Sequence, residues 1–210
     1  MEIAKLQYIT QFSNKKDILL EVEKYLSAGG RWVQLRMKNV SENEIIGVAK
    51  EVRKLCTAKN AVFLINDNPQ IALETEADGV HLGKSDTTTE EARKILGNDK
   101  IIGRTAHSFE DILDIARQKV DYIGLGALRK TQTKDNIAGV LGYEGYKHIF
   151  SKIDFKCPPI VAIGGVTSND ITTLLSIGLH GVAVSGIISR SENPEKITQL
   201  FIKTIKESII

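Results

Sequence analysis

The stretch L-I-N-D-N-P at residues 64–69, followed by G-V-H-L-G-K-S-D at residues 79–86, decides the fold of this 210-residue chain. Each segment is a short apolar run that closes on a carboxylate, Asp67 in the first and Asp86 in the second. If both runs are strands of one parallel sheet, the two carboxylates leave it at the same edge, because parallel strands place their C-terminal ends together. Two carboxylates at one edge are typical of a Mg²⁺ site that shares its remaining positions with water and phosphate oxygens. The alternative is that each aspartate only caps the helix that follows it.

The same alternation of strand and helix extends in both directions from this stretch. We expect strands at residues 6–10, 32–37, 61–66, 79–82, 100–105, 122–126, 159–163 and 181–184. Helical spacing of apolar residues predicts a helix after each strand, and the last helix is expected to bury a stripe containing Ile197, Leu200 and Phe201. Near-continuously apolar strands alternating with helices predict a parallel sheet covered on both faces. A closed (β/α)₈ TIM barrel, formed as a single domain by residues 1–210, explains the count better than an open doubly wound sheet.

The composition limits the classes of function that fit. Hydrophobic residues make up 42% of the chain and charged residues 26%, as in an ordinary soluble globular protein. A net charge of +2 without a basic tail argues against nucleic-acid binding. The chain opens on a strand-like segment and holds no apolar run of the ~18 residues that a membrane span needs. We therefore expect a cytoplasmic protein with small-molecule substrates and no nucleic-acid or membrane partner. A homodimer is left open, and Cys56 and Cys157 are expected to be apolar fillers.

Polar residues gather where the second strand ends, in Q-L-R-M-K at residues 34–38. Alternation along a strand places Gln34, Arg36 and Lys38 on one side. Arginine offers a planar fork of donors to phosphate oxygens, and lysine offers a mobile point charge. This strand end therefore predicts a diphosphate site, with a solvated edge as the alternative.

The ends of the later strands carry further candidates. The fifth strand ends G-R-T-A-H, which places Thr105 and His107 at the edge, although a lone histidine is more often a helix-start or core residue than a catalyst. The loop after the sixth strand contains T-Q-T-K, residues 131–134, a composition suited to closing over an anion.

Small residues follow the seventh and eighth strands. Gly164 and Gly165 end the seventh strand region, and Ser185 and Gly186 follow the eighth. Phosphate sites in barrels of this kind are often built from backbone N–H groups at these two positions. The edge thus predicts two anion sites, one cationic and metal-assisted for a diphosphate and one made of backbone amides for a monophosphate.

These motifs resemble the thiamine phosphate synthase family over about residues 6–194. The family's Q-x-R-x-K matches residues 34–38, its N-D matches residues 66–67, its G-V-H-L-G-x-x-D matches residues 79–86, its T-x-T-K matches residues 131–134 and its I-G-G matches residues 163–165. The resemblance implies a Mg²⁺-dependent transferase that joins hydroxymethylpyrimidine diphosphate to thiazole phosphate and releases diphosphate. It implies that the pyrimidine diphosphate is held by Gln34, Arg36, Lys38, Asn66 and Lys134, that Mg²⁺ is held by Asp67 and Asp86, and that the thiazole phosphate is held by Thr131, Thr133, Gly165, Ser185 and Gly186. Arg36, Lys38, Thr105 and Lys134 are the expected catalytic residues, with Thr105 also binding substrate.

The chain departs from the family pattern at three places. Thr105 stands where the family usually has Ser, Ser185-Gly186 stands where it usually has Val-Ser, and A-L-R-K precedes Thr131 where it tends to place a Pro. The segment G-R-T-A-H-S also resembles the sister family of thiazole tautomerases, which implies a metal-independent alternative with His107 as the proton-transferring group. That sister family typically lacks the paired carboxylates, so the synthase interpretation leads. A phosphate-binding barrel without chemistry is the remaining alternative.

Overall fold

The strands of the protein close into a parallel barrel in the order β1-β2-β3-β4-β5-β6-β7-β8, as predicted. This computed structural model describes residues 3–11, 14–130 and 139–209. The strands are β1 (Leu6–Ile9), β2 (Trp32–Leu35), β3 (Val62–Asn66), β4 (Gly79–Leu82), β5 (Ile101–Ala106), β6 (Tyr122–Gly126), β7 (Ile160–Ile163) and β8 (Gly181–Val184). Since every neighbouring pair is parallel, all eight C-terminal ends lie at one rim.

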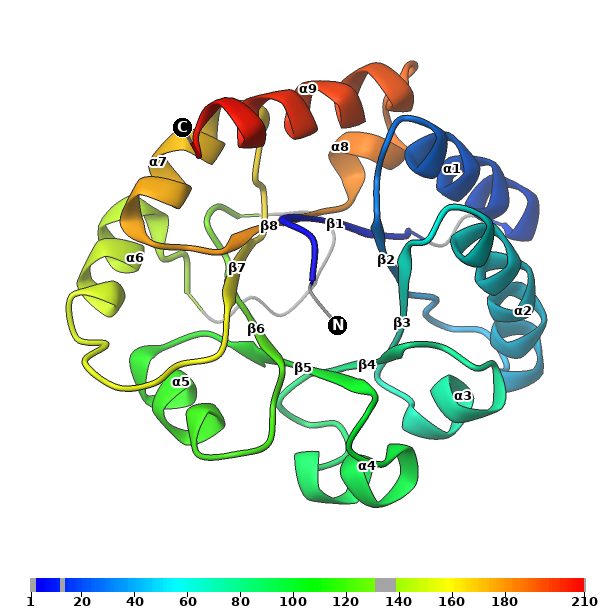
Figure 1. Ribbon diagram of the computed structural model, residues 1–210, viewed down its shortest axis with the longest axis horizontal. Coiled ribbons are helices and arrows are strands. Elements are labelled where there is room, and N and C mark those ends of the chain that lie inside the picture. The colour runs from blue at the N-terminus through cyan, green and yellow to red at the C-terminus, as the bar shows by residue number, and fades with distance from the viewer. Residues whose placement is uncertain (1–2, 12–13, 131–138, 210) are drawn as a thin grey trace.

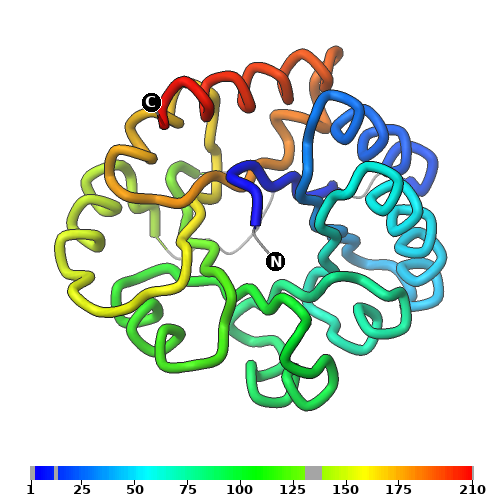
Figure 2. Tube along the Cα trace, in the orientation of Figure 1, coloured from blue at the N-terminus to red at the C-terminus, as the bar shows by residue number. Residues whose placement is uncertain are grey.

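Helices surround the barrel as an outer ring (Figure 1). They are α1 (Lys15–Ser27), α2 (Glu42–Ala58), α3 (Pro69–Glu74), α4 (Thr89–Leu96), α5 (Phe109–Ala116), α6 (Gly142–Phe150), η1 (Ser168–Asp170), α7 (Ile171–Ile177), α8 (Gly186–Ser189) and α9 (Pro194–Glu207). The last long helix, α9, lies beside the first, α1, so the two ends of the helix series meet and complete the ring (Figure 2). No helix in the described ranges is long and apolar enough to cross a membrane.

Two apolar clusters hold the fold together. The larger lies between the strands and the ring of helices and includes Tyr8, Phe63 and Phe201. The smaller fills the barrel and contains Trp32, Leu64, Tyr122 and other inward-facing residues. Burial at this scale stabilises the fold by roughly 25 cal/mol per Å² of apolar surface removed from water. The barrel is therefore a packed core, and ligands must bind at its rim.

Two details of the helices differ from expectation. The four-residue helix α8 follows β8 directly, where no helix was predicted, because a single turn carries no periodic apolar pattern. The predicted stripe of α9 was wrong at Leu200, which is exposed. Phe201 is buried as predicted, and Pro194, Thr198 and Ile205 complete the buried face.

Glycine at the start of β4 lets two strands approach closely. A Cβ atom added to Gly79 would stand 1.9 Å from the carbonyl oxygen of Ile101 in β5. We expect Gly79→Ala to lower the free energy of unfolding by about 1–3 kcal/mol, the usual cost of overpacking. Denaturant unfolding monitored by circular dichroism measures this change.

Gly47, in the middle of α2, provides the control. A Cβ there meets nothing within 4 Å, so Gly47→Ala should raise the free energy of unfolding by about 0.5–1 kcal/mol through helix propensity alone. Equal stability of the two variants would contradict the argument from strand spacing.

Candidate active site

The structure brings most of the predicted site residues to the C-terminal rim of the barrel. Gln34, Asn66 and Thr105 lie in β2, β3 and β5 near their C-terminal ends. The other described candidates, Arg36, Lys38, Asp67, Asp86, His107, Gly165, Ser185 and Gly186, follow the ends of their strands. The predicted residues Thr131, Thr133 and Lys134 lie outside the described ranges.

The carboxylate of Asp67 forms an ion pair with the ammonium group of Lys38. The backbone of Asp67 has a left-handed φ of 69°, an uncommon conformation for a residue other than glycine. Its N–H donates to the carbonyl oxygen of His81 at 2.8 Å, which joins the end of β3 to β4. This backbone contact positions the carboxylate between the cationic end of β2 and the loop after β4.

Neither aspartate is a helix cap. Asn68 caps α3, where its side chain accepts from the N–H of Ile71, and Thr88 caps α4 as part of a capping box. Asp86 instead closes the turn after β4 by accepting from the N–H of Gly83 at 2.6 Å. The capping alternative is therefore wrong for both residues.

The two carboxyl groups interact with each other. Burial, and then the hydrogen bond to Asp86, raise the pKa of Asp67, whereas Lys38 acts to lower it. Two neighbouring carboxylates are the hard oxygen donors that Mg²⁺ prefers. No group of three or more His, Cys, Asp or Glu side chains gathers anywhere in the described part of the chain. The Asp67 and Asp86 pair is a donor set of the kind that fits Mg²⁺, which usually keeps several waters and takes one or two carboxylates from the protein.

The end of β2 is tied to β1 through Thr10. The Thr10 hydroxyl accepts from the N–H of Arg36 at 2.9 Å and donates to the carbonyl oxygen of Arg36 at 3.2 Å. Gln34 is buried one pleat below, where its amide donates to Gln7 at 3.4 Å. Arg36 and Lys38 therefore leave the barrel from a fixed backbone.

A chain of buried polar side chains runs across the barrel interior to Thr105. Gln7 Nε2 donates to the Tyr122 hydroxyl at 3.1 Å, and that hydroxyl contacts His81 Nδ1 at 2.8 Å. His81 Nε2 lies 2.9 Å from Thr105 Oγ1. His81 therefore bridges the Tyr122 phenol and the Thr105 hydroxyl, which fixes the position of Thr105 at the rim.

The ring of His107 is hydrogen-bonded to the end of the neighbouring strand, β6. Its Nδ1 donates to the carbonyl oxygen of Gly126 at 2.7 Å, and its backbone N–H donates to Asp111 Oδ2 at 2.9 Å. These contacts fix the ring between β5 and β6, with Nδ1 already engaged.

Small residues follow the ends of β7 and β8, and Gly164, Gly165, Ser185 and Gly186 are together called the cup. Gly164 and Gly165 both have positive φ, 91° and 70°, which side chains rarely adopt, and a Cβ on Gly164 would collide with Ala127 at 2.5 Å. Ser185 Oγ is buried and makes no hydrogen bond within the described part of the molecule. An unpartnered buried hydroxyl beside exposed backbone is a feature that a bound anion would satisfy.

The sequence did not predict the ion pair between Arg129 and Asp170, which lies beside this cup. Both guanidinium amines of Arg129 donate to Asp170 at 2.6 Å, and Arg129 also donates to the carbonyl oxygen of Gly165 at 3.1 Å. Burial opposes ionisation of Asp170, but hydrogen bonds from Arg129, Tyr143 and Thr167 outweigh it and lower the pKa of Asp170. Arg129 stands in the A-L-R-K segment that departs from the family pattern, and it ties that segment to the β7 turn.

These features define a TIM-barrel protein with a polar rim of the kind at which such barrels carry their active sites. The family model described as thiamine monophosphate synthase matches residues 6–188, and the chain belongs to this family. The family interpretation drawn from the motifs is thereby confirmed, and the protein is an enzyme of the transferase class that acts on small molecules.

Individual relatives agree with the family assignment. The chain is 42% identical to a thiamine-phosphate synthase of Flavobacterium johnsoniae, over 98% of each chain. It is 41% identical to one of Bacteroides thetaiotaomicron, over 94% of this chain and 95% of the relative. A solved thiamine phosphate pyrophosphorylase of Pyrococcus furiosus superposes with a TM-score of 0.85 at 30% identity, covering 98% of this chain and 97% of its own.

The buried chain of polar groups supports both stability and the position of Thr105. We expect Tyr122→Phe to lower the free energy of unfolding by about 1–3 kcal/mol, because Gln7 Nε2 and His81 Nδ1 would lose their buried partner. Denaturant unfolding measures the change. A variant as stable as the wild type would show that the phenol is dispensable to this chain.

Proposed function

We propose that the rim catalyses the Mg²⁺-dependent joining of hydroxymethylpyrimidine diphosphate and thiazole phosphate to give thiamine phosphate and diphosphate. The observation that carries this proposal is the Asp67 and Asp86 carboxyl pair, which adjoins Lys38 and is separate in the barrel order from the cup after β7 and β8. One region suits a diphosphate and a metal ion, and the other suits a monophosphate.

The diphosphate region is built from consecutive strands. We assign pyrimidine diphosphate binding to Gln34, Arg36, Lys38, Asn66, Thr105 and Lys134. The guanidinium of Arg36 offers a bidentate contact to phosphate oxygens, which is stronger than a neutral hydrogen bond. Lys38 already holds a carboxylate in this structure, so it is placed to share its charge between that carboxylate and a phosphate.

Asp67 and Asp86 are the proposed Mg²⁺ ligands. When bound, Mg²⁺ supplies Lewis-acid stabilisation of the charge on the departing diphosphate. The chain's own part is to hold two carboxylates at one place through the β4 carbonyl and the turn at Gly83.

The monophosphate region is the proposed thiazole phosphate site. We assign it to Thr131, Thr133, Gly165, Ser185 and Gly186. The absence of a side chain at Gly165 allows a phosphate to approach the backbone. The buried Ser185 hydroxyl supports the assignment because it lacks a partner among the described residues.

The proposed reaction is a substitution at the methylene carbon of the pyrimidine. The carbon–oxygen bond to the diphosphate breaks, and its electron pair leaves with the diphosphate. The thiazole nitrogen donates its electron pair to the same carbon and forms the new carbon–nitrogen bond. Arg36, Lys38 and Lys134 stabilise the leaving group, while the Thr105 hydroxyl, oriented by His81, is placed to donate to the pyrimidine diphosphate.

We also propose that the whole chain acts as one domain in the cytoplasm. Cys56 and Cys157 carry free thiols, which suits a reducing compartment. We propose in addition that the chain forms a homodimer, and sedimentation equilibrium would measure its mass in solution.

The metal assignment separates the synthase from the tautomerase interpretation. We expect Asp67→Asn and Asp86→Asn each to slow thiamine phosphate formation by at least about 100-fold, because loss of a Lewis-acid contribution costs several kcal/mol. EDTA should abolish the reaction, whereas His107→Asn should retain substantial activity. Steady-state kinetics with both phosphorylated substrates measure these effects.

Asp99→Asn is the matched control, since Asp99 lies in the turn between α4 and β5, at the end of the barrel opposite the rim. It removes the same charge away from the rim and should leave turnover unchanged. If EDTA and both rim aspartate variants have no effect while His107→Asn abolishes thiazole isomerisation, the tautomerase interpretation replaces the synthase proposal.

The cup assignment predicts a substrate-selective defect. We expect Gly165→Val to raise the KM for thiazole phosphate by at least about 10-fold, because a branched side chain would press on Arg129 and crowd the place where phosphate meets backbone. The KM for the pyrimidine diphosphate should change little. Initial rates with each substrate varied in turn give both constants.

Gly97→Val controls for backbone strain. Gly97 also has a positive φ, 77°, but a Cβ there meets nothing within 4 Å at the end of α4. It should cost stability without altering either KM. Loss of pyrimidine binding by a folded Gly165→Val variant would refute the cup assignment.

A further inference from the structure

The guanidinium of Arg190 lies directly over Gly186. A Cβ atom added to Gly186 would stand 2.3 Å from Arg190 Nη2 and 2.7 Å from Nη1. The two residues are four apart across α8, and the Arg190 N–H donates to the Gly186 carbonyl oxygen at 3.1 Å. Because helical side chains lean towards the N-terminal end of the helix, Arg190 points back to the cup after β8.

The charge of Arg190 is not neutralised by an acidic side chain in the described ranges. Arg190 takes part in none of the ion pairs found there. Its Nη1 donates to the neutral amide oxygen of Gln11 at 3.3 Å, and the Ser189 hydroxyl donates to the same oxygen at 3.0 Å. The amide orients the guanidinium without cancelling its charge, which leaves donors for an anion.

This position coincides with a departure from the family pattern. The family resemblance described above implies a serine at the position of Gly186, and this chain offers no side-chain hydroxyl there. The space where that side chain would begin is filled by the guanidinium.

We propose that Arg190 binds the phosphate group of the thiazole substrate and supplies the side-chain donor that Gly186 lacks. The proposal rests on the assignment of the cup to the thiazole phosphate. A guanidinium brings a positive charge and paired donors to a phosphate dianion, whereas a serine hydroxyl brings one neutral donor. Arg190 would therefore make this cup more selective for a phosphorylated thiazole than one built from backbone amides alone.

The test compares Arg190→Gln with the wild-type enzyme on two thiazole substrates, the phosphate and the unphosphorylated alcohol. We expect the KM for the thiazole phosphate to rise about 10- to 100-fold, the usual effect of losing a charge-assisted contact. The KM for the pyrimidine diphosphate and any KM for the alcohol should stay near wild type, and inhibition by inorganic phosphate competing with thiazole phosphate should weaken.

Two further variants distinguish binding from structural support. Arg190→Lys, which keeps the charge, should lose less than Arg190→Gln. The double variant Gly186→Ser with Arg190→Gln places a hydroxyl in the vacated space and should recover part of the lost affinity. A residue that only braced Gln11 would not be rescued in this way.

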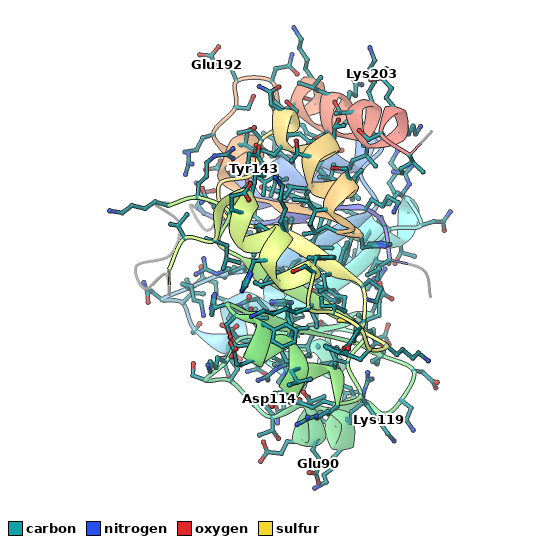
Figure 3. The ribbon with its side chains drawn as sticks, turned by 90° about the vertical axis from the view of Figure 1, so that its left-hand side faces the viewer. Glu90, Asp114, Lys119, Tyr143, Glu192 and Lys203 are labelled. Carbon is teal, nitrogen blue, oxygen red and sulfur yellow. The ribbon has the colours of Figure 1, made fainter. Side chains whose placement is uncertain are left out.

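Arg117→Gln is the control for loss of one positive charge. Arg117 is the C-cap residue of α5 and lies two positions before Lys119 in the sequence, just as Arg190 lies two positions before Glu192. Figure 3 shows Lys119 and Glu192 on opposite sides of the molecule. It should leave both KM values unchanged. Unfolding curves confirm that each variant is folded.

The outcomes separate this proposal from the one on which it rests. If Gly165→Val weakens thiazole phosphate binding and Arg190→Gln does not, the cup is correct and the role of Arg190 is wrong. If neither variant affects thiazole phosphate, both the cup assignment and the role of Arg190 are wrong. Equal losses for the phosphate and the alcohol would also overturn the role of Arg190.

Discussion

The contact between the Tyr122 hydroxyl and the His81 ring, in the middle of the barrel, is the interaction on which the rim depends. Both groups are buried, so each must find a partner inside the protein or incur the cost of desolvation. Glycine supplies the room: a Cβ on Gly103 would stand 2.2 Å from the Tyr122 ring, and one on Gly124 would stand 3.2 Å from His81. The result links β1, β4, β5 and β6 through side chains and ends on the hydroxyl of Thr105. The same polar chain that satisfies the core thereby orients a group at the rim.

The fold could be predicted from the sequence because the patterns that indicate each strand and helix lie within short stretches of the chain. Apolar runs, capping residues and turn glycines recur in register with each strand and helix, and a parallel arrangement then brings every strand end to one rim. The carboxylates of Asp67 and Asp86 could be placed at the rim in the same way, since Asp67 directly follows β3 and Asp86 lies in the turn after β4. What failed was fine detail within an element, such as the exposed Leu200 on α9, where spacing alone does not fix which side of a helix faces the barrel.

The contacts that shape the site could not be predicted because they join residues that are distant in sequence. From the sequence, His81 is predicted to lie in a buried strand, and no motif near it indicates that Tyr122 and Thr105 are its partners. Arg129 and Asp170 lie 41 residues apart, yet they tie the segment after β6 to the turn after β7. Arg190 and Gly186 are close in sequence, but their contact depends on the single turn of α8. That helix is too short to give a periodic signal in the sequence.

The order of strands in a closed barrel also explains why the rim suits the union of two anionic molecules. Arg36, Lys38, Asp67 and Asp86 come from β2 to β4, whereas the small-residue cup comes from β7 and β8, so the barrel order separates the two regions. Like charges repel strongly when they are brought together in a site of low dielectric, and separate anchors keep a diphosphate and a monophosphate apart. In the proposed arrangement, the uncharged parts of both molecules meet between these two regions. In the proposed reaction the bond forms between these uncharged parts, so binding energy from the two phosphate groups is used to align the reacting carbon and nitrogen.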